Sequence, residues 1–134
     1  MKIIVLGCGN IGSVIAKDLA DNIPDAEITT TDIMRKRAEA VASSIKGAKW
    51  LTLDVTDSSA LVETLRKNDL VVGALPGDYG YQALKAAIEA GVDMVDVSFT
   101  PENPLKLDEE AREAGVTIIP DCGVAPGLSN MLIG

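Results

Sequence analysis

The sequence has no histidine, and of its 134 residues only two are cysteine and 3% are aromatic. The lack of histidine removes the commonest acid–base side chain and most transition-metal sites, so we expect no metal centre. Two cysteines are too few for a disulfide framework, and the N-terminus lacks the pattern of a secretory signal. A reducing cytoplasm is therefore the expected location.

Positive charge is also scarce, because 12 Lys and Arg residues stand against 20 Asp and Glu residues, a formal net charge of −8. This balance argues against nucleic acid or an anionic membrane surface as a partner. No apolar run approaches the length that spans a bilayer. With 47% hydrophobic residues, the chain can still bury the core of one domain.

The opening segment predicts a buried strand followed by a phosphate-binding turn. Residues 3–6 are consecutive apolar residues, and glycines then fall at the spacing Gly7-x-Gly9-x-x-Gly12, where apolar residues at helical spacing begin with Ile11. The first glycine permits a tight turn, the second lets the backbone approach a pyrophosphate, and the third lets helix and strand pack closely. The diphosphate would lie on the free N–H groups at the helix start. The alternative is an ordinary tight turn between a strand and a helix.

A second predicted strand, residues 27–31, ends at Asp32 at the spacing expected for the acid that binds the adenosine ribose. Its carboxylate can accept both ribose hydroxyls and would repel a 2′-phosphate, which favours NAD over NADP. Arg35, Lys36 and Arg37 follow closely and could partly reverse this preference, although a solvated helix face is the commoner role of such cations.

Strand and helix patterns alternate through the chain. Helices are predicted over residues 35–45, 81–90 and 107–114, and between residues 56 and 65. Strands are predicted at residues 2–6, 27–31, 49–53, 69–75, 92–98 and 116–119. This alternation, with right-handed crossovers, predicts an α/β fold: a Rossmann-type, doubly wound, parallel six-stranded sheet with helices on both faces. A dinucleotide would cross the carboxyl ends of its strands.

Residues 1–124 thus form one predicted dinucleotide-binding domain. Residues 125–134 leave the last strand as a loop and begin a helix, capped by Ser129 or Asn130, that is too short to be stable alone. We expect residues 125–134 to start a connection to a C-terminal substrate domain that lies beyond this sequence.

Two turns at strand ends carry further candidates for cofactor contact. Asp54 and Val55 follow the third strand, where an adenine edge would lie, although Asp54 could equally cap the next helix. Ala74, Leu75 and Pro76 follow the fourth strand and would flank the nicotinamide ribose, unless the segment is simply a turn.

Polar side chains near the ends of the fifth and sixth strands are candidates for the chemistry. Asp96 and Ser98 share one strand face, so at least one of them is expected to be structural. Asp121 is the better catalytic candidate, because this acid follows a strand and precedes a glycine-containing loop. Bracing that loop is its alternative role.

Four segments together resemble the N-terminal part of the saccharopine dehydrogenase family, with the closest likeness to its lysine 6-dehydrogenase branch. They are residues 7–12, residues 74–77, residues 92–99 with Pro101-Glu102-Asn103-Pro104, and residues 123–130. The resemblance runs from Met1 to Gly134; the glycine loop is generic, whereas the two later segments are specific.

The resemblance implies an NAD-dependent dehydrogenase that acts on an amine-bearing carbon, either the ε-carbon of L-lysine or saccharopine. The partner would be a small amino-acid substrate, and the full-length enzyme would be a homo-oligomer. A base must take a proton from the substrate ammonium, because a cation resists hydride loss. By position, Ser98 and Asp121 would face the nicotinamide. The cofactor would contact Gly7, Gly9, Asn10, Ile11, Gly12, Asp32, Asp54, Val55, Ala74, Leu75 and Pro76.

One position departs from the family pattern. Saccharopine-forming reductases usually carry an acid before the last Pro-Gly, where this chain has Ala125. This difference favours the lysine branch. The alternative from another functional class is a non-catalytic nucleotide-sensing regulatory domain, which would share the glycine loop and Asp32. The Pro-Glu-Asn-Pro segment, residues 101–104, argues against it.

Overall fold

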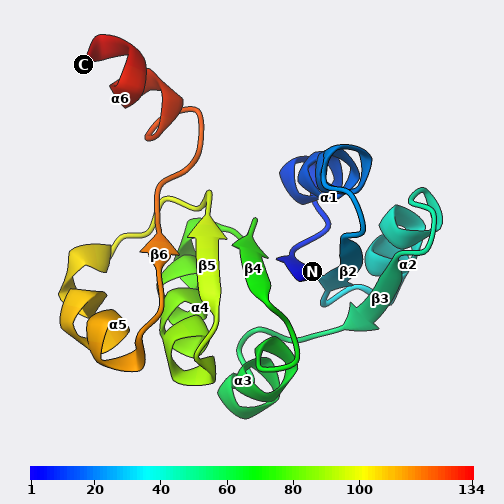
Figure 1. Cartoon of the computed structure of the whole chain (residues 1–134), viewed down its shortest axis with the longest axis horizontal. Coiled ribbons are helices and arrows are strands. Elements are labelled where there is room, and N and C mark those ends of the chain that lie inside the picture. The colour runs from blue at the N-terminus through cyan, green and yellow to red at the C-terminus, as the bar shows by residue number, and fades with distance from the viewer.

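The computed structural model describes residues 1–134 and contains one six-stranded sheet with the strand order β3-β2-β1-β4-β5-β6. All neighbouring strands are parallel (Figure 1). The predicted Rossmann-type α/β fold is therefore confirmed. The strands are β1 (Lys2–Leu6), β2 (Glu27–Asp32), β3 (Lys49–Thr52), β4 (Leu70–Gly73), β5 (Asp93–Asp96) and β6 (Ile118–Ile119).

The helices cover both faces of the sheet. The chain moves from β1 to one edge, returns through α3 to β4, and then moves to the other edge, so right-handed crossovers place α1 and α2 opposite α3, α4 and α5. The helices are α1 (Asn10–Asn22), α2 (Arg35–Ser43), α3 (Ser58–Leu65), α4 (Gly77–Ala90), the 3-10 helix η1 (Pro104–Leu107), α5 (Asp108–Ala114) and α6 (Leu128–Ile133).

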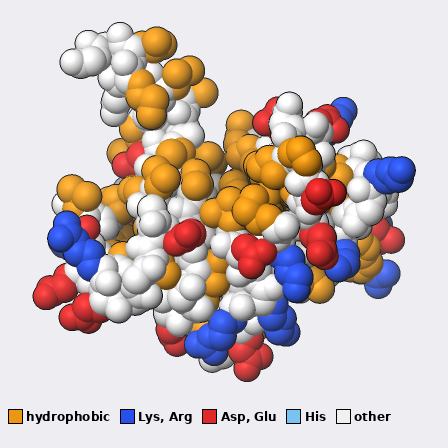
Figure 2. All heavy atoms as spheres, in the orientation of Figure 1, with side chains coloured by type: hydrophobic (Ala, Val, Ile, Leu, Met, Phe, Trp, Pro, Cys, Tyr) orange, Lys and Arg blue, Asp and Glu red, His pale blue; other side chains and the backbone are white.

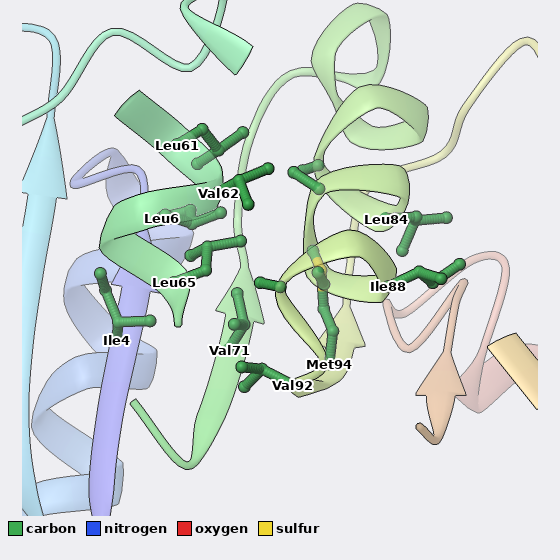
Figure 3. Packing of buried hydrophobic residues seen from close by; sticks show 14 of the residues in the cluster. Ile4, Leu6, Leu61, Val62, Leu65, Val71, Leu84, Ile88, Val92 and Met94 are labelled. Carbon is green, nitrogen blue, oxygen red and sulfur yellow. The ribbon is translucent and has the colours of Figure 1, made fainter. Parts of the chain in front are cut away.

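Strand β1 is buried on both of its faces, which explains its unbroken apolar sequence. Ile4 and Leu6 belong to the larger core cluster, where side chains of α3 and α4 meet the sheet (Figure 3). Ile3 and Val5 face the other way and pack with Ala16 of α1. The alternation of side chains along one strand thus divides the core into two layers.

The register of β1 positions the turns that follow the strands. Leu6 pairs with Thr31 of β2 on one side and with Gly73 of β4 on the other. The glycine loop, Asp32 and the segment after β4 therefore leave the sheet side by side. This place, where the strand order reverses, is where open α/β sheets bind ligands.

Several boundaries differ from the sequence expectations. Helix α4 begins at Gly77, four residues before the expected position 81, with Pro76 as its N-cap. The expected cap of the last helix at Ser129 or Asn130 is wrong: α6 begins at Leu128, and its N-cap is Gly127 with φ 126°. Glycine adopts this backbone region readily, so Gly127 sets the boundary without any side-chain cap.

Helix α6 stands clear of the rest of the molecule (upper left in Figure 1), and none of its residues is buried. No helix of the chain has both the length and the apolar character needed to cross a membrane.

Candidate dinucleotide site

A cavity of about 390 Å³ lies at the carboxyl ends of β1 to β4. Its walls come from the glycine loop, the end of β2, the turn after β3 and the segment after β4. The structure places all the residues expected to contact the cofactor around this cavity, with the exception of Gly12. In Figure 2 hydrophobic atoms gather in this region, between α1 and the upper end of β4.

The start of α1 offers free hydrogen-bond donors to this cavity. Its N-cap is Gly9, with no side-chain cap and no acidic residue in the first turn. The first helical bond runs from the Ser13 N–H to the Gly9 carbonyl at 3.0 Å, so the preceding N–H groups have no partner within the helix. A Cβ on Gly9 would meet no protein atom within 4 Å. This open, positively polarised end suits a pyrophosphate.

The other two glycines of the loop are packed against the chain. Gly7 has φ +94°, and a Cβ there would lie 2.6 Å from the carbonyl oxygen of Ala74. A Cβ on Gly12 would lie 2.9 Å from the carbonyl carbon of Gly7. The geometry therefore matches the three roles expected from the motif: a turn, an open approach and close packing of the helix.

Ile11 lies on the cavity side of α1 rather than against the sheet. Its side chain is 60% exposed and lines the cavity together with Leu75 and Val55. Ile11 was among the residues expected to contact the cofactor. An apolar wall here could pack against a flat ring of a bound ligand.

Asp32 ties the glycine loop to the end of β2. Its Oδ2 accepts a hydrogen bond from the Cys8 N–H at 3.0 Å, and its Oδ1 accepts one from the Met34 N–H at 2.8 Å. Each carboxylate oxygen keeps a further lone pair, so the group can still accept ribose hydroxyls.

Cys8 is a packing residue of the loop. Its thiol donates to the Thr31 carbonyl oxygen at 3.4 Å. Burial, followed by the charge of Asp32, raises the pKa of the Cys8 thiol to about 11. The side chain is therefore a neutral thiol at neutral pH and not a nucleophile.

Of the two roles that were open for Asp54, the structure does not give it that of the helix cap. Its Oδ1 accepts hydrogen bonds from the Thr56 hydroxyl at 2.7 Å and from the Thr56 N–H at 2.9 Å, and these bonds lower the pKa of the Asp54 carboxyl. The helix cap is Asp57, which accepts from the Ala60 N–H at 3.0 Å. Asp54 braces the turn and also lines the cavity.

Ser98 and Asp121 are not among the residues that line the cavity. The Ser98 hydroxyl is buried and donates to Asp96 Oδ2. Asp121 is half-buried and has φ 58°, and the next N–H, of Cys122, donates to the Asp96 carbonyl oxygen at 2.8 Å. Their catalytic roles stay predictions.

Sequence reasoning missed several residues of the cavity wall. Ile33, Leu53 and Thr56 line it. Each lies directly beside a residue that was expected to contact the cofactor, and this adjacency was the available signal.

A glycine-rich turn, an uncapped helix start and an acid at the end of β2 meet at the point where the strand order reverses, so the chain is an NAD(P)-binding domain of the Rossmann class. The family model described as "Saccharopine dehydrogenase NADP binding domain" matches residues 3–119. The chain belongs to this family.

Individual relatives agree with the assignment. The L-glutamate-forming, NADP(+) saccharopine dehydrogenase of Saccharomyces cerevisiae is 31% identical over 130 residues, which cover 97% of this chain and 29% of that protein. The mitochondrial alpha-aminoadipic semialdehyde synthase of Mus musculus is 30% identical over 133 residues, or 98% of this chain and 14% of that protein.

Solved structures were compared as well. An apo structure of the L-glutamate-forming enzyme from Saccharomyces cerevisiae matches with a TM-score of 0.88 at 30% identity and covers 98% of this chain and 29% of its own. GenD2 from gentamicin A biosynthesis, in complex with NAD, has a TM-score of 0.68 at 22% identity over 90% of this chain and 34% of its own, a likeness of fold alone.

The comparisons correct the expected branch of the family. Relatives from three fungi are L-glutamate-forming saccharopine dehydrogenases, so the expected closest likeness to the lysine 6-dehydrogenase branch is wrong. That expectation was supported by the residue at one position, Ala125, whereas the family match extends over residues 3–119. The chain spans less than a third of these relatives' length.

Proposed function

We propose that this chain is the NAD(P)-binding part of an oxidoreductase that acts on the secondary amine of saccharopine. The observation that carries the proposal is the cavity at the strand ends, with its free helix start, open Gly9 and braced Asp32, in a chain of the saccharopine dehydrogenase family. The Saccharomyces cerevisiae relative is named for the L-glutamate-forming reaction.

Bound NAD(P) would supply the acceptor for a hydride from the carbon beside the nitrogen. The protonated amine must first lose a proton to a base, because the positive charge opposes hydride departure. Water then adds to the resulting carbon–nitrogen double bond and releases an amine and a carbonyl compound. The protein therefore has to hold the dinucleotide, accept one proton and admit one water.

Asp96 and Asp121, which lie near the ends of β5 and β6, are not equally suited to accept a proton from the substrate. Asp121 is half-buried and follows β6, so we propose it as the proton acceptor. Asp96 is fully buried, and its Oδ2 is bonded to Ser98. Ser98 then acts by packing the end of β5 rather than by touching substrate.

For the cofactor we propose NAD as the preferred dinucleotide, with NADP also accepted. The Asp32 carboxylate lines the cavity beside the expected ribose position and disfavours a 2′-phosphate. Relatives are named as NADP(+) enzymes, which supports some NADP use in this chain as well.

The test is to supply the protein at its natural length with saccharopine and either NAD or NADP, and to follow nicotinamide reduction by absorbance. L-Lysine is the parallel substrate. Reduction of the nicotinamide when saccharopine is supplied, together with release of glutamate, supports the proposal. Reduction with L-lysine alone would move the substrate to a primary amine. Binding of NAD without turnover of either substrate would favour a nucleotide-sensing domain.

The same assay tests the proposed base. Asp121→Asn should lower turnover by about 10²- to 10⁴-fold, the usual contribution of a positioned general base, and should remove the acidic limb of the pH profile. Unchanged turnover across that profile would exclude Asp121 as the proton acceptor.

A further inference from the structure

Three consecutive basic residues, Arg35, Lys36 and Arg37, follow the end of β2, beside the cavity wall formed by Asp32 and Ile33. A dinucleotide with its adenosine ribose on Asp32 would bring the 2′-position of that ribose toward this segment. The structure distinguishes the three cations.

Arg35 is turned toward β3 and is already engaged. Its guanidinium carbon lies 5.0 Å from the centroid of the Trp50 ring. Its Nε lies 3.6 Å from Glu39 Oε2, one helical turn further along α2. Arg35 is not part of the cavity wall, and neither is Lys36.

Arg37 is the only cation in the cavity wall. Its side chain has no ion pair and donates no hydrogen bond within the protein, so all its guanidinium N–H groups are free for a ligand. It lies in the first turn of α2, which carries no acidic residue and no side-chain cap. The N–H groups of Arg35 and Lys36 precede the first helical bond, from Arg37 N–H to the Met34 carbonyl at 2.9 Å.

The environment of Asp32 weakens the repulsion that its charge would exert on a phosphate. Two backbone N–H groups, those of Cys8 and Met34, already donate to its two oxygens. These donors offset part of the carboxylate charge, and Arg37 adds a full positive charge to the same wall.

We propose that Arg37, rather than Arg35, binds the 2′-phosphate of NADP, and that it lets this NAD-type site accept both dinucleotides. The proposal rests on the proposed dinucleotide site. Asp32 holds the ribose, the planar guanidinium of Arg37 binds phosphate oxygens in pairs, and the free start of α2 adds to the positive potential.

The test compares ligand pairs that differ only in the 2′-phosphate, by calorimetric titration of the protein in buffer of fixed salt concentration. The pairs are NADP against NAD, and adenosine 2′,5′-bisphosphate against AMP. Arg37→Ala should lower the affinity for the phosphorylated member of each pair about ten-fold and change that for NAD and AMP less than two-fold. Arg37→Lys should keep part of the difference, because lysine retains the charge but loses the paired geometry.

Arg35→Ala is the matched control, two residues away on the same helix. It should leave both affinity ratios unchanged. If Arg35→Ala lowers the bisphosphate affinity and Arg37→Ala does not, the assignment to Arg37 is overturned. An equal loss for both members of each pair in Arg37→Ala overturns it too, since the residue would then not read the 2′-position. If the unaltered protein binds none of the four ligands, the proposed dinucleotide site itself fails.

Discussion

At the scale of single residues, Asp96 is the one acidic side chain that is completely buried. Its Oδ1 has no hydrogen-bond partner, and no Lys or Arg forms an ion pair with it. Burial raises the pKa of the Asp96 carboxyl above 3.8, hydrogen bonds from Ser98 lower it, and the charge of Asp121 adds a small increase. An unpaired acid in this position is tolerated most easily in its neutral form.

This arrangement predicts a pH-dependent stability with a definite sign. Because the folded-state pKa of Asp96 lies above the unfolded value of 3.8, its contribution is fully present below about pH 4 and is lost as the pH rises through the folded-state pKa. Asp96→Asn has no proton to lose. Its unfolding temperature should therefore rise relative to that of the unaltered protein between pH 4 and the folded pKa and stay level above it.

Ser98→Ala is the control for that measurement. It keeps the acid and removes a hydrogen bond that lowers the Asp96 pKa, so the pH dependence should persist and extend to higher pH. Thermal unfolding of the three proteins across pH is the measurement. Parallel curves for Asp96→Asn and the unaltered protein would mean that Asp96 does not titrate differently on folding.

Sequence patterns identified most of the residues in the cavity wall. They did not predict which side chains are buried or already engaged by neighbouring residues. The spacing of Gly7, Gly9 and Asp32 has a direct physical meaning, because a tight turn and a backbone approach each need a particular residue at a particular offset. The choice between Arg35 and Arg37 could not be predicted, since it depends on Trp50, which lies on β3 and not on the helix that carries both arginines. The burial of Ser98 depends in the same way on Gly80 of α4, and that of Asp96 on Gly73 of β4, because these glycines leave room for the two side chains.

At the scale of elements, the contact between α1 and the glycine loop separates two glycines that look equivalent in the sequence. A methyl group on Gly12 would run into the Gly7 carbonyl, whereas one on Gly9 would enter the open cavity. Gly12→Ala should lower the free energy of unfolding by about 1–3 kcal/mol, because a packed interface must open. Gly9→Ala should change it by less than about 0.5 kcal/mol.

For NAD binding the order of the two variants should be reversed: at temperatures where both are folded, Gly9→Ala should be the more affected. Gly9→Ala places a methyl group where a pyrophosphate would approach, so its affinity for NAD should fall while its denaturant midpoint stays. Denaturant unfolding and NAD titration of both variants are the measurements. A stable Gly12→Ala protein, or normal NAD binding by Gly9→Ala, would contradict the roles given to these residues.

Element order followed from the sequence because each βα unit has its own pattern, and so did the ends of α4 and α5, whereas other boundaries did not. Pro76 was interpreted as part of a turn, yet its fixed φ of −56° makes it the N-cap of α4. Gly91 and Gly115 have φ values of +72° and +68° and end α4 and α5. Such helix ends depend on local backbone conformation and are more predictable than strand ends, which depend on neighbouring strands.

At the scale of the whole molecule, the C-terminal helix α6 contributes nothing to the buried core. All buried residues lie in the sheet, the helices α1 to α5 and the segments between them, and α6 contributes none. Met131, Leu132 and Ile133 are 78%, 78% and 87% exposed. Stability per residue is therefore uneven, and the segment that leaves β6 should open independently of the rest.

This separation predicts the effect of removing α6. Deletion of residues 128–134 from the 134-residue chain should leave its unfolding temperature and its NAD affinity unchanged, because no core contact and no cavity residue is lost. It should also reduce self-association at high concentration, since an exposed apolar surface is removed.

Leu61→Ala is the matched control: this α3 side chain is fully buried, so its truncation should cost about 2–5 kcal/mol. Thermal unfolding, NAD titration and sedimentation of the three proteins decide the matter. A large loss of stability on deletion would show that α6 packs against the domain in solution, and that the sheet and its five covering helices are not a self-sufficient unit.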